Sequence, residues 1–290
     1  MGSKEERCEG WQGGVDRVAV ENLNRITKLY MLRLSELSIV ESKDALRDIP
    51  EGKVLINTIN AHSFNTALKD ELFAEALRTV DSGQLTVDRE CVKYLIPDGA
   101  SIIQACKFLK AKSQPKERIA GWDLFSFEME RVKRRSKREE GRGKVMFMGS
   151  SEKVLTLIKE KAAVDYPNLD VVTYSPPYKP EFSDEDNAAI IKAINDANPD
   201  LLWIGMTAPK QEKWTYSHWK ELNIHCHVGT IGAVFDFYAG TAKRAPEWWQ
   251  NHSLEWLYRL CIEPKRMWRR YILGNPLFVW NVIKELRVES

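Results

Sequence analysis

The 290-residue sequence contains no run of about 18 apolar residues, so no membrane-spanning helix is expected. Its first eleven residues, MGSKEERCEGW, lack the apolar core of a secretory signal. The chain has no G-x-G-x-x-G segment followed by an acid about 20 residues on, which argues against a dinucleotide-dependent dehydrogenase or epimerase. The five cysteines show neither a CxxC pair nor metal-ligand spacing, which favours reduced thiols in a cytoplasmic protein. They are Cys8, Cys91, Cys106, Cys226 and Cys261.

Strand and helix patterns alternate from Val54 onward. Apolar runs bounded by turn residues predict strands, and apolar residues at three- and four-residue spacing predict helices. Four strand–helix units in series indicate an α/β protein with a mostly parallel, doubly wound sheet and helices on both faces. Residues 21–48 are expected to be helical and then strand-like. After the strand at Val54, the expected elements are helix 64–80, strand 92–96, helices 100–112 and 122–137, strand 144–148, helix 152–163, strand 170–174, helix 183–197, strand 200–206, helix 208–221 and strand 224–228.

A carboxylate lies between a predicted strand and a predicted helix in the stretch from Tyr94 to Phe108. The strand-like run ends at Pro97, Asp98 and Gly99 follow, and apolar residues then recur at helical spacing. Open α/β sheets bind their ligands at this position, beyond the carboxyl ends of the strands. Asp98 is therefore either a functional carboxylate or only the cap of the following helix.

A second strand end, further upstream, carries the short polar side chains of Thr58, Asn60 and His62 immediately before a helix. If the two strands are neighbours, they direct a carboxylate, a hydroxyl and an amide at one crevice. This arrangement favours the functional interpretation of Asp98.

Three later strand ends also suit an anionic ligand. Gly149 precedes two serines where a helix opens, and the free N–H groups at a helix start bind anions. Pro209 suits the first turn of the next helix, and Lys210 is either a phosphate ligand or an ordinary surface lysine. Gly232 and Asp236 belong to a glycine-containing apolar segment, whose glycines either allow close approach of a ligand or form tight turns.

Metal-binding patterns are weak. Asp184 and Asp186 have the DxD spacing that some enzymes use to hold a divalent metal, but Ser183 precedes them at a helix start and capping explains them. His225 and His227 alternate in a strand pattern, which is a weak zinc signal. Neither a metal nor another cofactor is expected.

Two segments are rich in basic residues. Residues 131–144 hold eight Lys or Arg and two Glu, a composition typical of a solvated helix end, with attraction to a membrane or phosphate as the alternative. Residues 241–290 have a helical pattern and contain five of the ten tryptophans, with nine Lys or Arg against five Asp or Glu. Tryptophan interleaved with arginine suits an anionic bilayer surface, while helices packed on the core explain the same pattern.

Seven short motifs occur in a fixed order between about residues 50 and 280. They are Thr58-Ile59-Asn60, Ile96-Pro97-Asp98-Gly99, Arg118-Ile119-Ala120-Gly121-Trp122-Asp123, Ala208-Pro209-Lys210-Gln211-Glu212, Gly232-Ala233-Val234-Phe235-Asp236-Phe237, Lys243-Arg244-Ala245-Pro246 and Glu255-Trp256-Leu257-Tyr258-Arg259. Together they resemble the bacterial WecG/TagA/CpsF glycosyltransferase family (glycosyltransferase family 26), which includes N-acetylmannosaminyltransferases. The first 30 or so residues show no such resemblance.

The resemblance implies an inverting, metal-independent glycosyltransferase with a Rossmann-like fold. Such an enzyme moves a hexose or N-acetylhexosamine, such as N-acetylmannosamine (ManNAc) or its uronic acid (ManNAcA), from a UDP-sugar to a polyprenyl-diphosphate-linked sugar in bacterial cell-surface polysaccharide synthesis. The implied protein is cytoplasmic and peripheral at the inner face of the cell membrane. It binds an anionic membrane surface and no nucleic acid, and a homo-oligomer away from the membrane is left open. The implied domains are a poorly ordered or helical extension at 1–30, a Rossmann-like catalytic domain at 31–242 and a helical membrane-binding appendage at 243–290.

The resemblance also implies roles in catalysis. Asp98 matches the proposed base, Thr58 and Asn60 match residues near the sugar and the acceptor, and Arg118 matches a further catalytic residue. Inversion needs one in-line displacement, in which a carboxylate deprotonates the attacking hydroxyl while cationic groups stabilise the departing diphosphate. A non-catalytic UDP-sugar-binding scaffold is the alternative, against which the intact Thr58, Asn60 and Asp98 argue.

Donor and membrane-side residues follow from the same resemblance. Gln211 matches a substrate-binding residue and Tyr178 a nucleotide contact, although the segment Pro177-Tyr178-Lys179 departs from the family's Gly-Tyr-Phe. Three arginines of the appendage are expected over the active site, namely Arg259, Arg266 and Arg269. Arg270 is an alternative to Arg269.

Overall fold

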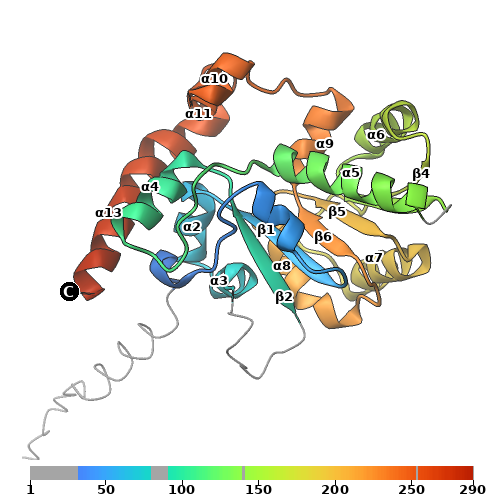
Figure 1. Ribbon diagram of the computed structural model, residues 1–290, viewed down its shortest axis with the longest axis horizontal. Coiled ribbons are helices and arrows are strands. Elements are labelled where there is room, and N and C mark those ends of the chain that lie inside the picture. Colours follow the sequence, from blue (N-terminus) through green and yellow to red (C-terminus); the bar gives the residue numbers. More distant parts are fainter. Residues whose placement is uncertain (1–31, 80–90, 139–140, 253, 290) are drawn as a thin grey trace, which may run out of the picture. The chain divides into compact units, whose positions relative to one another are not determined.

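The computed structural model describes residues 32–79, 91–138, 141–252 and 254–289. At its centre is a six-stranded parallel sheet with the strand order β2-β1-β6-β5-β3-β4 (Figure 1). The strands are β1 (Val54–Ile59), β2 (Val92–Pro97), β3 (Gly143–Gly149), β4 (Leu169–Tyr174), β5 (Leu201–Gly205) and β6 (His227–Thr230). The parallel α/β sheet predicted from the alternating patterns and the Rossmann-like fold implied by the resemblance are both confirmed. The predicted extension at 1–30 lies outside the described residues.

Helices connect the strands and continue to the end of the described chain. Those between strands, or directly after the last one, are α2 (Ala61–Ala67), α3 (Glu71–Leu77), α4 (Ala100–Phe108), α5 (Gly121–Arg138), α6 (Glu152–Asp165), α7 (Asp184–Ala197), α8 (Lys210–Ser217) and α9 (Gly232–Ala239). The C-terminal ones are α10 (Glu247–Asn251), α11 (Glu255–Ile262), α12 (Pro264–Trp268), the π-helix η4 (Arg269–Leu273) and α13 (Gly274–Glu289). No helix in these ranges has the length and apolar character needed to cross a membrane.

Some elements differ from those expected. The helix predicted at 64–80 is two helices, because the Asp70 carboxylate accepts from the N–H of Phe73 and starts α3 afresh. The helix at 100–112 ends at Phe108, and that at 208–221 ends at Ser217 before the 3-10 turn η3 (Trp219–Glu221). The last strand begins three residues late, at His227, where it pairs with both β1 and β5. The described part of 21–48 holds no strand, only the 3-10 turns η1 (Leu34–Glu36) and η2 (Asp44–Asp48).

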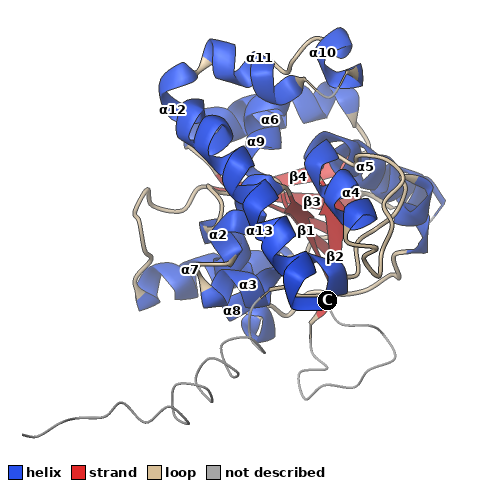
Figure 2. Ribbon diagram, turned by 90° about the vertical axis from the view of Figure 1, so that its left-hand side faces the viewer, coloured by secondary structure: helices blue, strands red, loops and turns tan. Residues whose placement is uncertain are grey.

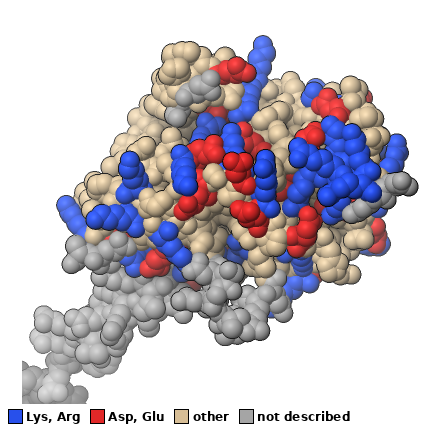
Figure 3. Space-filling model, in the orientation of Figure 1, with Lys and Arg blue, Asp and Glu red and all other residues tan. Residues whose placement is uncertain are grey.

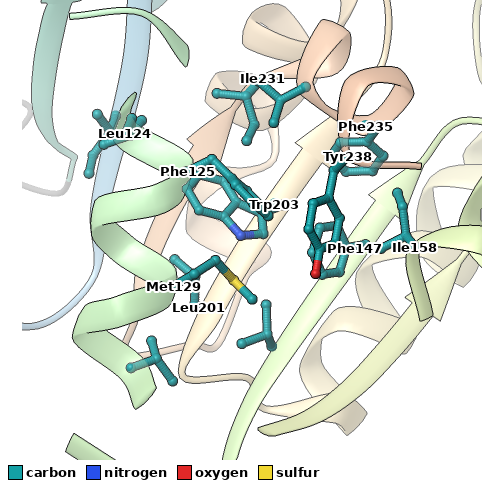
Figure 4. Packing of buried hydrophobic residues seen from close by; sticks show 14 of the residues in the cluster. Leu124, Phe125, Met129, Phe147, Ile158, Leu201, Trp203, Ile231, Phe235 and Tyr238 are labelled. Carbon is teal, nitrogen blue, oxygen red and sulfur yellow. The ribbon is translucent and has the colours of Figure 1, made fainter. Parts of the chain in front are cut away.

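Apolar side chains bury both faces of the sheet. On one face, α5, α6 and α9 pack around aromatic rings of the central strands, with the rings of Phe125 and Trp203 5.6 Å apart and those of Phe147 and Phe235 5.3 Å apart (Figure 4). On the other face, α7 and α8 pack around a second cluster that includes Trp214. Burial on both faces explains why these strands appear in the sequence as apolar runs rather than as alternating patterns.

The basic run at 131–144 begins in the C-terminal half of α5. Figure 3 shows Lys and Arg side chains gathered over this part of the helix. Arg134, Lys137 and Arg138 are exposed, while Arg131 and Arg135 pair with the carboxylate of Glu51 at 3.9 and 3.5 Å. The run thus begins in a helix end with exposed cations, as expected, and attraction to a membrane or phosphate stays the alternative.

The last helix, α13, packs against α2, which follows the first strand (Figure 2). The rings of Phe64 and Phe278 meet edge to face with centroids 5.7 Å apart. The buried amide of Asn65 donates to the carbonyl of Gly274 (2.8 Å) and accepts from Asn281 (2.9 Å). The sequence predicted the C-terminal helices as a separate appendage. These apolar and polar contacts join them to the α/β core.

Glu285, near the end of α13, holds the start of η1. Its carboxylate accepts from the backbone N–H groups of Leu34 (3.1 Å) and Ser35 (2.8 Å) and from the Ser35 hydroxyl (2.6 Å). The Glu285 residue is only 8% exposed, so water does not replace these bonds in the folded protein. One buried carboxylate thus joins the two ends of the described chain.

Replacing Glu285 by alanine is expected to lower the free energy of unfolding by about 2–4 kcal/mol, because three buried donors lose their acceptor. Urea unfolding followed by circular dichroism measures the loss. The matched control is Glu36→Ala, which removes an exposed pair with Arg33 and should cost no more than about 1 kcal/mol. Equal losses in the two variants would contradict the assigned role of Glu285.

Candidate active site

Asp98 lies directly beyond the carboxyl end of β2 and beside the end of β1. Its backbone N–H donates to the carbonyl of Ile59 (2.8 Å), so the ladder continues past the last residue pair of the two strands. Because side chains alternate along strands, this register places Thr58 and Asn60 on the same face as Asp98. A Cβ added at Gly99 would lie 3.6 Å from the Asn60 Cβ, which shows that the two strand ends nearly touch. The structure therefore brings these three predicted residues together.

Asp98 does not cap the helix that follows it. Gly99 occupies the N-cap position of α4, and no side chain caps that helix. Asn60, in contrast, caps α2: its Oδ1 accepts from the N–H groups of His62 and the next residue, both at 3.0 Å, and its Nδ2 has no hydrogen-bond partner among the described residues. Partial burial and the nearby charge of Arg270 lower the pKa of His62 to about 4, so this ring is neutral at pH 7. The Asp98 side chain is 32% exposed and can be reached by a substrate.

Arg118 approaches Asp98 from the loop before α5. A backbone hydrogen bond from Ile119 to the last residue of β2 (3.0 Å) fixes this loop. The Nε of Arg118 lies 3.8 Å from Oδ1 of Asp98, while its Nη2 donates to Oε2 of Glu255 at 2.5 Å. Glu255 belongs to α11, and its other oxygen lies 3.6 Å from the Nη2 of Arg259. Alternating charges thus connect the end of β2 to the C-terminal helices.

Partial burial, which removes much of the water around the carboxyl group, raises the pKa of Asp98 to about 6. The negative charge of Glu255 acts in the same direction, and the positive charges of Arg118, Arg259 and Arg270 act against it. A carboxyl group with this pKa is mostly ionised at pH 7 and is a stronger base than an ordinary aspartate. Asp98 therefore has the location, the access and the proton affinity that a general base requires.

The C-terminal arginines are placed unequally around this carboxylate. Arg259 and Arg270 are close enough for their charges to lower the pKa of Asp98. Arg269 instead lies over the ring of Trp268, 5.3 Å from its centre, and no interaction joins it to Asp98 in the described part of the chain. Arg266 belongs to α12, and its side chain lies outside the described structure. Functional roles for Arg266 and Arg269 stay predictions.

Glycines bring the ends of β3, β5 and β6 into close contact. Gly149 has a φ of +115°, and a Cβ there would lie 2.3 Å from the carbonyl oxygen of Gly205. The Oε1 atom of Gln211 accepts from the N–H groups of Met206 (3.1 Å) and Gly232 (3.2 Å). Gln211 is 4% exposed, so its amide links the loops that follow β5 and β6. Donor binding by Gly149, Gln211 and Gly232 stays a prediction.

Pro209 and Lys210 line a cavity of about 360 Å³ between α3, α7 and α8. The Nζ of Lys210 donates to the carbonyl of Lys179 (2.6 Å) and lies 3.4 Å from the centre of the Phe182 ring, and partial burial lowers its pKa. Tyr178 is fully exposed on the loop after β4. Within the described ranges, no contact joins these residues to Asp98, so the structure leaves this part of the predicted site separate from that carboxylate.

Asp236 lies in the middle of α9 and is half-buried. Its Oδ1 accepts from the hydroxyl of Thr241 (3.3 Å), and its backbone carbonyl accepts from the N–H groups of Thr241 and Ala242. These bonds close the end of the helix. A contact between the Asp236 carboxylate and a substrate stays a prediction.

Structural interactions occupy one residue of each of the two metal-like patterns. Oδ2 of Asp186 accepts from the N–H of Ser183 (3.0 Å) and from Nζ of Lys179 (2.7 Å), which confirms the capping interpretation of this acidic cluster. His227 is buried, with Nδ1 3.1 Å from Glu128 and Nε2 2.9 Å from a backbone carbonyl. In the ranges that the structure describes, no group of three His, Cys, Asp or Glu is placed to hold a metal ion.

Two acidic residues near the predicted site residues were not themselves predicted as site residues. Glu255 is a buried partner of Arg118 at a distance of 137 positions, and an acid in the first turn of a helix ordinarily indicates exposure. Glu212 is 2% exposed, accepts from Nε2 of Gln211 (2.8 Å), and has its pKa raised by burial to about 7. Both belong to motifs quoted for the family resemblance, and that position was their only signal.

A parallel α/β sheet with a carboxylate of raised pKa and several arginines beyond the strand ends is an arrangement typical of enzymes that bind anionic substrates. Residues 27–290 match the model of the glycosyl transferase WecG/TagA/CpsF family, so the chain belongs to this family and is a glycosyltransferase. The family predicted from the motifs is confirmed.

Three curated relatives of the chain share the name N-acetylglucosaminyldiphosphoundecaprenol N-acetyl-beta-D-mannosaminyltransferase. The protein of Bacillus subtilis (strain 168) is 28% identical over 231 residues, which cover 80% of this chain and 79% of the relative. That of Bacillus spizizenii (strain ATCC 23059 / NRRL B-14472 / W23) is 29% identical over 197 residues, 68% of this chain and 70% of the relative. That of Staphylococcus aureus (strain NCTC 8325 / PS 47) is 28% identical over 195 residues, 67% and 70% of the two chains.

Proposed function

We propose that this glycosyltransferase moves N-acetylmannosamine, or a related hexose or N-acetylhexosamine, from a UDP-sugar to a polyprenyl-diphosphate-linked sugar, with inversion and without a metal. The product serves cell-surface polysaccharide synthesis. The observation that carries the proposal is Asp98, a reachable carboxylate of raised pKa beside Thr58 and Asn60 at the carboxyl edge of the sheet. The relatives' names, which pair a diphosphoundecaprenol-linked acceptor with a β-mannosaminyl product, support the substrate class.

The reaction is a single displacement. Asp98 accepts the proton of the acceptor hydroxyl as its oxygen attacks the anomeric carbon, and the bond from that carbon to the UDP oxygen breaks on the opposite side. This converts an α-linked donor into a β-linked product. The departing diphosphate gains negative charge, and Arg259 and Arg270, both close enough to act on Asp98, supply positive charge at this edge of the sheet.

In this proposal the C-terminal helices are an appendage of the catalytic domain. They form the side of the protein that faces the membrane. Nine of the fourteen large hydrophobic side chains that are exposed in the described residues belong to them. Aromatic and aliphatic side chains on a basic surface suit the headgroup region of an anionic bilayer. The nine are Trp248, Trp256, Ile262, Trp268, Ile272, Leu273, Val279, Trp280 and Leu286. A peripheral position at the inner face of the cell membrane follows, because UDP-sugars and the membrane-bound acceptor meet there.

The test supplies the purified protein with UDP-ManNAc and a short-chain polyprenyl-diphosphate-GlcNAc, in the presence of EDTA. Mass spectrometry should detect a disaccharide on the lipid together with free UDP, and NMR of the product should show the β-anomer. A panel of other UDP-sugars in the same assay identifies the preferred donor. Absence of transfer from every donor, or a strict requirement for a divalent metal, would contradict the proposal.

A further inference from the structure

Glu255 is the one buried residue of α11, and it is 9% exposed. Its two carboxylate oxygens face two different arginines, Oε2 towards Arg118 at 2.5 Å and Oε1 towards Arg259 at 3.6 Å. A buried carboxylate with charge-assisted hydrogen bonding of this kind fixes the position of its partner. Glu255 therefore determines where the Arg118 guanidinium lies.

The position of Arg118 matters because this residue lies between two carboxylates. Its contact with Glu255 is short, whereas its Nε stays 3.8 Å from the Asp98 oxygen, beyond hydrogen-bonding distance. A planar guanidinium can form a two-point pair with a carboxylate, and the Nη2 group that would join Nε in such a pair with Asp98 already donates to Glu255. A two-point pair between Arg118 and Asp98 would engage the carboxylate oxygens that the acceptor hydroxyl needs.

We propose that Glu255 is a positioning residue for the transfer reaction, which holds Arg118 away from Asp98 so that the carboxylate of Asp98 stays free to accept a proton. This inference rests on the proposed function, since it concerns the base named there. Because Glu255 belongs to α11, the C-terminal helices then set the strength of the base, in addition to supplying arginines.

The charges around Asp98 fix the direction of the expected effect. Arg118, Arg259 and Arg270 lower its pKa, and Glu255 raises it; Arg118 itself also faces Asp123. Removing the charge of Glu255 removes its upward effect on the pKa of Asp98, while the three arginines that lower this pKa remain. It also releases Arg118 from its contact with Glu255. The pKa of Asp98 should therefore fall, which weakens it as a base.

The test compares the wild type with Glu255→Gln, which keeps the size of the side chain and an oxygen facing Arg118. We expect the acid limb of the pH profile of kcat, where kcat falls as the pH is lowered, to move to lower pH by about one unit. We expect kcat on the plateau to fall about tenfold, because a weaker base accepts the proton less readily. The KM for the UDP-sugar should stay within about twofold, since the variant loses no ground-state donor contact. Glu255→Asp, which keeps the charge, should restore the limb to higher pH.

Glu247→Gln is the matched control, an exposed glutamate of the neighbouring helix α10, and should leave the profile unchanged. A ¹³C NMR titration of the Asp98 carboxyl, assigned with Asp98→Asn, follows the same pKa without turnover. The inference would be overturned if the acid limb of the pH profile and the pKa of Asp98 from NMR were the same in Glu255→Gln as in the wild type. A wild type without transferase activity would refute the proposed function alone, because the titration still decides whether Glu255 controls Asp98.

Discussion

Replacing Asp98 by asparagine is expected to reduce kcat about 10²- to 10⁴-fold, the usual contribution of a general base. Asparagine has nearly the same shape, so the contacts of the β2 end are kept while the ability to accept a proton is lost. The wild type should lose activity as the pH falls through about 6, since protonation of a carboxyl with this raised pKa removes the base below that pH. The variant should lack this acid limb.

Steady-state release of UDP between pH 4.5 and 8.5 measures both effects. The control is Asp44→Asn, a carboxylate whose side chain is 89% exposed and pairs only loosely with Arg47 at 3.8 Å. Binding of UDP to the Asp98→Asn variant, measured by calorimetry, checks that the donor site is intact. Equal rates of UDP release in wild type and variant would remove Asp98 from the role of base.

The second large effect concerns the outer face of the C-terminal helices. A triple variant with Ile272, Val279 and Trp280 changed to glutamine removes three side chains that are 55–58% exposed. Binding to vesicles with anionic lipid should fall at least about 100-fold, because each apolar side chain contributes on the order of 1 kcal/mol or more at the interface. Transfer to a vesicle-embedded acceptor should fall with it.

Sedimentation with vesicles of defined anionic content gives the bound fraction, and transfer to a short-chain, water-soluble acceptor gives the intrinsic rate. We expect the triple variant to keep that intrinsic rate, because the changed side chains point to solvent. Val164→Gln is the control, an apolar residue of α6 that is 79% exposed on the catalytic core. Vesicle binding that is unchanged in the triple variant would exclude this surface as the membrane contact.

Sequence patterns predicted those parts of the fold and of the site that depend on residues close to one another in the chain. The apolar runs of β1 and β2, each followed by short polar residues, indicated that Thr58, Asn60 and Asp98 share one edge, and the register confirms it. The capping role of Ser183 and Asp186 was also predictable, since a capping box depends only on the four successive residues from the N-cap to the third residue of the helix. The break at Asp70 was not foreseen, because the apolar period continues across it.

Long-range contacts could not be predicted in this way. No period or spacing connects Arg118 with Glu255, and the charge of Glu255 suggests exposure until the fold buries it. The arginines after Pro264 show a related difficulty. Arg270 rather than Arg269 acts on Asp98, although the two are adjacent at the start of the π-helix η4. Helical spacing alone cannot place such residues.

The contacts of α13 with α2 and η1 determine how membrane attachment and catalysis can be separated experimentally. A chain shortened before this helix would leave Phe64 without its ring partner and Leu34 and Ser35 without their acceptor. Loss of activity after such a cut would report a damaged interior just as readily as a missing lipid contact. Surface substitutions on the intact protein are therefore the sound way to ask what the bilayer contributes to turnover.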